Sequence, residues 1–70
     1  MPLIQVSMLE GRSDEQKAAL IGALTDACVT AIGAAVETVT VVITDVPATH
    51  WGVMGRSIKQ RRAEAAGNGG

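Results

Sequence analysis

The chain has 70 residues and a formal net charge of −1, and 47% of its residues are hydrophobic. So short a chain forms a single domain, and its charge argues against the basic surface with which proteins bind nucleic acid. With one cysteine and one histidine it has neither an internal disulfide nor a zinc site of paired Cys and His ligands, so no metal is expected.

The size of the chain predicts association with other chains. One small core contributes little stability, and the hydrophobic content is higher than the surface of a small monomer tolerates. We therefore predict a tight homo-oligomer or hetero-oligomer. No membrane span or signal peptide is predicted, because Asp26, Glu37 and Asp45 interrupt the apolar stretches and the N-terminus has no charged segment before an apolar one. A lone cysteine and no signal favour a cytoplasmic location.

The first two predicted elements are a strand and a helix. Apolar residues alternate along residues 3–9, LIQVSML, which predicts a strand with one wholly apolar face. Ser13 and Gln16 then have the spacing of a capping box, whose side chains satisfy unpaired backbone donors at a helix start. Apolar residues follow at spacings of three and four up to Gly33, the predicted end of the helix. They are Leu20, Leu24, Ala27, Cys28, Ala31 and Ile32.

A second strand is predicted over residues 39–44, VTVVIT, because this β-branched run is typical of a well-buried central strand. Two strands joined by a helix form a right-handed β-α-β unit with parallel strands. The predicted fold class is therefore α/β (α+β in a broader classification), and the protomer is a β-α-β unit. Its helix covers one face of the sheet and leaves the other face bare.

The C-terminal part is predicted to contain a loop or short hairpin. Pro47 ends the second strand, and two glycines lie close to Trp51, the only aromatic residue. We expect a single domain over residues 1–62. Residues 63–70 end in GNGG and have nothing to bury, so they are predicted to form a disordered tail.

Pro2, directly after Met1, has two interpretations. As the rigid first residue of an edge strand, a proline loses nothing through its missing N–H. Alternatively, Met1 is removed because the small second residue permits its excision. Pro2 then becomes a free secondary amine, a base or nucleophile that no internal residue provides. Position alone favours the first interpretation.

Several segments together resemble the 4-oxalocrotonate tautomerase family over residues 2–62. They are the N-terminal Pro2, LEGRSDEQK at residues 9–17, VVIT at 41–44 and HWG at 50–52. The resemblance implies a β-α-β protomer that assembles as dimers arranged into hexamers, with active sites where subunits meet. It also implies cytoplasmic isomerase activity that needs no cofactor.

The resemblance implies a catalytic role for Pro2. In that family the processed N-terminal proline is the general base that moves a proton between an enol and its conjugated keto isomer. An apolar pocket and a nearby arginine both disfavour the charged form of an α-amino group, which leaves more neutral base at cytoplasmic pH. The expected substrate is a small unsaturated carboxylic acid.

Two further residues match substrate-binding positions of the family. Arg12 aligns with an arginine that binds a substrate carboxylate, for which a planar, permanently charged fork is suited. Alternatively, Arg12 forms a surface salt bridge with Glu10 or Asp14. Trp51 matches a bulky aromatic that walls the pocket, although packing in a subunit interface is nearly as good an explanation.

Two other side chains are assigned no catalytic role. His50 is expected to be exposed, and nothing in the sequence gives it a function. Cys28 lies on the apolar stripe of the helix, which favours a small core residue over a nucleophile.

The sequence departs from the family pattern at Thr40. Founding members carry there a second arginine that helps to bind and polarise the substrate, whereas a threonine offers one neutral donor. Three explanations remain open. The substrate is smaller or has one carboxylate, a partner chain or Arg56 supplies the missing arginine, or the protein is a low-activity member that hydrates or dehalogenates unsaturated acids. A different class, a non-catalytic binding or assembly subunit, also stays open.

Overall fold

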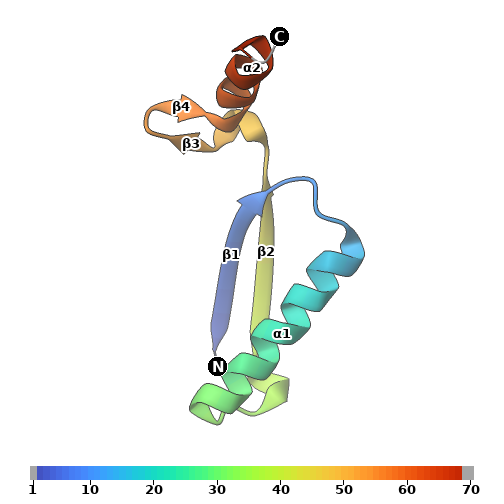
Figure 1. Ribbon diagram of the computed structural model, residues 1–70. Coiled ribbons are helices and arrows are strands. Elements are labelled where there is room, and N and C mark those ends of the chain that lie inside the picture. The colour runs from blue at the N-terminus through green and yellow to red at the C-terminus, as the bar shows by residue number, and fades with distance from the viewer. Residues whose placement is uncertain (1, 69–70) are drawn as a thin grey trace.

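The computed structural model describes residues 2–68 (Figure 1). Its first half contains strand β1 (Leu3–Leu9), helix α1 (Asp14–Ile32), the 3-10 turn η1 (Val36–Thr38) and strand β2 (Thr40–Val46). Its second half contains the 3-10 turn η2 (Ala48–His50), strands β3 (Gly52–Val53) and β4 (Arg56–Ser57), and helix α2 (Ile58–Asn68). The first half has the strand, helix and strand that the sequence predicts, and the second half has the predicted hairpin and in addition helix α2. This arrangement confirms the fold class.

Strands β1 and β2 pair in parallel, with Leu3 opposite Thr40 and Leu9 opposite Val46. Helix α1 connects them and lies across one face of the sheet (Figure 1). The side chains on that face are half-buried, and those on the other face are mostly exposed. This arrangement confirms the β-α-β unit with one bare sheet face.

Helix α1 begins and ends as the sequence predicts. Ser13 and Gln16 form both hydrogen bonds of the capping box, and Gly33 ends the helix with a left-handed backbone at φ 69°. The apolar stripe is covered only in part, since the two-stranded sheet is too narrow for a helix of 19 residues. Leu20, Leu24 and Cys28 are half-buried, whereas Ala27, Ala31 and Ile32 are exposed.

None of residues 2–67 is fully buried, so an isolated chain has no closed core there. The accessible surface is 5075 Å², whereas a compact monomer of this mass exposes roughly 4,100 Å². The radius of gyration is 16.5 Å, against about 11 Å for a compact domain of this length. The prediction of a well-buried central strand is thus wrong for the single chain, because Val42 on the bare face is 43% exposed.

Residues 48–68 form an arm that extends beyond the end of β2 (Figure 1). Strands β3 and β4 are an antiparallel hairpin whose two turn residues, Met54 and Gly55, have φ values of 56° and 81°. This pair of positive angles is typical of a type I′ turn. The hairpin confirms the prediction made around Trp51.

The predicted disordered tail differs from the structure, because α2 continues to Asn68. Ser57 and Gln60 form a second capping box at its start. Arg56, which precedes the helix, forms an ion pair with Glu64 within it. Alanines at positions 63, 65 and 66 are also strong helix formers. Residues 69 and 70 lie outside the described residues. No helix in the described part is long and apolar enough to cross a membrane.

Candidate functional site

Pro2 and Thr40 lie together at one end of the sheet. The backbone N–H of Thr40 donates a hydrogen bond to the Pro2 carbonyl oxygen at 3.0 Å, which extends the β1–β2 ladder by one step. Pro2 is half-buried and Thr40 is exposed. Met1 lies outside the described residues, so its expected removal stays a prediction.

Arg12 lies at the opposite end of β1. Seven strand residues separate it from Pro2, and a strand of that length spans about 23 Å. Arg12 follows Gly11, whose φ of 121° directs the chain from the strand end toward α1. Neither ion pair of the described residues involves Arg12, so the alternative of a salt bridge with Glu10 or Asp14 finds no support in the structure.

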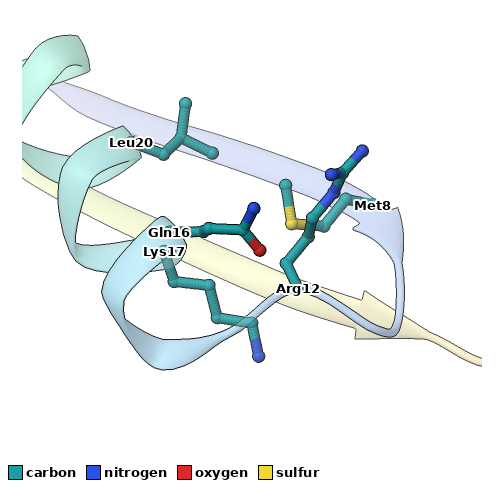
Figure 2. A pocket seen from close by; sticks show the side chains of 5 residues that line it. All are labelled: Met8, Arg12, Gln16, Lys17 and Leu20. Atoms are coloured by element: carbon teal, nitrogen blue, oxygen red, sulfur yellow. The ribbon is translucent and has the colours of Figure 1, made fainter.

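Arg12 is one of the residues that line an open pocket of about 210 Å³ (Figure 2). The lining residues come from the end of β1, the connecting loop and the first two turns of α1. They are Met8, Arg12, Gln16, Lys17 and Leu20. The pocket therefore combines apolar walls with a guanidinium group, which suits a carboxylate attached to an apolar body.

Lys17 does not compete with Arg12 for an anion, because it already has a partner. Its Nζ lies 2.5 Å from the Asp45 carboxylate at the end of β2. Figure 2 shows the Lys17 amino group and the Arg12 guanidinium pointing to opposite sides. The hydrogen bond to Asp45 raises the pKa of Lys17 above its ordinary value of 10.5, and the charges of Asp45 and Asp14 act in the same direction. Among the five lining residues, Arg12 is thus the cation left without a carboxylate.

Trp51 lies in the arm, away from Pro2. It is half-buried, and its carbonyl oxygen accepts a hydrogen bond from the Ile58 N–H at 2.8 Å, which ties the start of the hairpin to α2. His50 beside it is exposed. Arg56 is held in the arm by its ion pair with Glu64, so within one chain it does not stand in for an arginine next to Thr40.

The predicted site residues therefore fall into three groups within one chain. Pro2 and Thr40 share one end of the sheet, Arg12 has its own pocket at the other end, and Trp51 belongs to the arm. A base at one end of a strand cannot act on a ligand held at the other end. A site that uses both Pro2 and Arg12 requires a second chain.

Sequence reasoning missed Gln16 as a lining residue of the Arg12 pocket. It was recognised only as a capping residue. Its spacing of four from Arg12 is a signal that could have been used, because Arg12 immediately precedes the helix cap. Cys28 is half-buried on α1, and no group of metal-ligating side chains occurs within residues 2–68.

The comparisons with known proteins point to one family. The family model described as tautomerase enzyme matches residues 2–61. A 2-hydroxymuconate tautomerase of Comamonas testosteroni is 52% identical over 60 residues, which make up 86% of this chain and 95% of that protein.

Two solved structures extend this similarity to the fold. TomN, a 4-oxalocrotonate tautomerase homologue of the tomaymycin biosynthetic pathway, is 48% identical with a TM-score of 0.87. The match covers 89% of this chain and 95% of TomN. A heterohexameric 4-oxalocrotonate tautomerase of Chloroflexus aurantiacus J-10-fl is 45% identical with a TM-score of 0.83, over 86% of this chain and 97% of that one.

Proposed function

Because the chain belongs to the tautomerase enzyme family, we propose that it moves a proton between the enol and keto forms of a small unsaturated carboxylic acid. Its named relatives are tautomerases, so the chain is an enzyme of this kind. Pro2 is the proposed general base, Arg12 the ligand of the substrate carboxylate and Trp51 an apolar wall. The name of the Comamonas relative makes 2-hydroxymuconate the first substrate to test.

The proposed reaction is a proton shift that leaves the enzyme unchanged. The neutral Pro2 amine, freed by removal of Met1, takes the proton of the enol. The resulting ammonium group returns a proton to a carbon of the conjugated system, and the amine is neutral again. Arg12 holds the carboxylate throughout, so that the reacting carbons stay next to the amine.

The observation that carries this proposal is the separation of Pro2 and Arg12 along β1. Arg12 is exposed and forms no ion pair among the described residues, and it lies at the opposite end of the strand from Pro2. We infer that a site takes Pro2 from one chain and Arg12 from another. None of residues 2–67 is fully buried, and the bare sheet face and the arm expose apolar side chains. Contacts with another chain would bury them, which supports such an assembly.

Thr40 supports a second candidate function. It is the residue hydrogen-bonded to Pro2, and it offers no charge to a substrate there. The protein is then one subunit of a hetero-oligomer, in which a related chain supplies an arginine, as in a relative that is itself a heterohexamer. A low-activity or purely binding role is the remaining outcome if no such partner exists.

Intact-mass measurement after incubation with 3-bromopropiolate, a small electrophilic acid, tests the proposal. We expect loss of Met1 and one adduct per chain, which peptide fragmentation places on Pro2. An Arg12→Ala variant should react much more slowly, because the acid is no longer held near the amine. Retained Met1, or an adduct elsewhere in the chain, would overturn the role of Pro2 and favour a binding or assembly subunit.

A further inference from the structure

We propose that Gln16 is a second ligand of the substrate carboxylate and donates to it from the side-chain amide, beside the Arg12 guanidinium. The proposal rests on the function proposed above and adds a residue that sets the specificity of the same pocket. Gln16 lines this pocket together with Arg12. Figure 2 shows its side chain extending toward Met8 and the aliphatic part of Arg12.

The helix cap fixes the orientation of the Gln16 amide. The side-chain oxygen Oε1 accepts a hydrogen bond from the Ser13 N–H at 2.9 Å, and the Gln16 N–H donates to Ser13 Oγ at 3.1 Å. Only the oxygen of an amide accepts a hydrogen bond, so the amino group Nε2 must lie on the other side. Gln16 therefore presents an oriented donor at no further cost in side-chain entropy.

This donor has no partner among residues 2–68. The hydrogen bonds of the described chain include none from Gln16 Nε2. Arg12 also has no carboxylate partner there, whereas Lys17 is held by Asp45. The pocket thus has two kinds of donor, the Arg12 guanidinium and the Gln16 amide NH₂, which can bind both oxygens of a carboxylate. Met8 and Leu20 form its apolar walls.

Gln16→Glu separates this role from capping. A glutamate keeps the acceptor for the Ser13 N–H, since Glu and Gln both serve in capping boxes. It loses the NH₂ donor and places a negative charge next to the substrate carboxylate. The chain also contains a matched control, because Gln60 forms the same capping box with Ser57 at the start of α2. Gln60 does not line the Arg12 pocket.

The test is NMR of the isotope-labelled full chain titrated with cis,cis-muconate, a dicarboxylate that the enzyme cannot tautomerise. We expect saturable shifts of the Gln16 side-chain NH₂ and the Arg12 Nε–H signals, while the Gln60 NH₂ stays unchanged. Gln16→Glu should weaken muconate binding about tenfold or more, as expected for a lost hydrogen bond to a charged group. Gln60→Glu should change it less than about twofold.

The outcomes separate the two proposals. Movement of Arg12 without Gln16, or equal losses in the two glutamate variants, would overturn the role of Gln16 and leave the proposed function intact. If neither signal moves and 3-bromopropiolate leaves Pro2 unmodified, the proposed function fails, and the assignment of Gln16 fails with it. Thermal unfolding of both variants tests whether the helix caps are preserved.

Discussion

The backbone N–H of Thr40 donates to the carbonyl oxygen of Pro2 at 3.0 Å, so the threonine found where the resemblance implies an arginine is fixed directly beside the proposed base. The bond uses only backbone atoms. Substitutions at position 40 can therefore change the side chain next to Pro2 without removing the contact that positions it.

Thr40→Arg should raise activity toward 2-hydroxymuconate. The new guanidinium would stabilise charge that develops on the substrate, and one such donor is typically worth on the order of 10²-fold in rate. The measurement is kcat/KM, with Thr40→Met as the uncharged control of similar length. No gain over the control would contradict the idea that the missing arginine limits this chain.

Thermal stability should depend strongly on protein concentration. No residue in the described range is fully buried in one chain, so most of the apolar contacts that stabilise the fold must form between chains. Association makes the unfolding midpoint rise with concentration. Calorimetry over a wide concentration range checks this, and a constant midpoint would show that the single chain is stable by itself.

The Lys17–Asp45 pair should give stability that is lost in alkali. The hydrogen bond to Asp45 raises the pKa of Lys17 above 10.5, so the folded chain holds this proton more tightly than the unfolded chain. The stabilisation is fully present below pH 10.5 and disappears as the pH rises through the folded pKa.

Urea unfolding of the wild type and Lys17→Met, at a series of pH values above and below that point, measures this effect. The wild type should be the more stable protein at neutral pH, and the difference should shrink in alkali. Asp45→Asn should behave like Lys17→Met. A difference that does not change with pH would show that the pair contributes through packing alone.

Met54 should destabilise the folded chain through its backbone conformation in the hairpin turn. Its φ of 56° is left-handed, a conformation that costs a residue with a Cβ about 1 kcal/mol or more. Its side chain is 90% exposed. Met54→Gly should therefore unfold with a free energy roughly 0.5–1 kcal/mol higher than Met54→Ala, which keeps the Cβ. Urea unfolding at matched protein concentration compares the two, and equal stability would contradict the strain.

Local sequence signals were sufficient to predict the β-α-β unit. The alternation of residues 3–9, the Ser13–Gln16 capping box and Gly33 each act over a few residues, and each element begins and ends close to its predicted position. The helix at residues 58–68 was missed because its own capping box, Ser57 and Gln60, lies in a mixed, polar segment with no apolar periodicity.

The candidate site could be predicted only in part. The roles of Pro2 and Arg12 came from the resemblance to a family, and the spacing of residues along the chain could not show that the two lie at opposite ends of β1. Gln16 was overlooked because its capping role already accounted for it. The pairing of the chains that contribute Pro2 and Arg12 to one site depends on contacts between subunits, which the sequence of a single chain does not encode locally.

The central claim is that each active site takes Pro2 and Arg12 from different chains, and mixing two variants of strongly reduced activity tests it most directly. Pro2→Ala and Arg12→Ala proteins are unfolded together, refolded and assayed with 2-hydroxymuconate, with each variant refolded alone as the control. Random association should restore both residues in about a quarter of the sites, and activity should return in proportion. If the mixture is no more active than its components, Pro2 and Arg12 do not meet across an interface and the composite site is wrong.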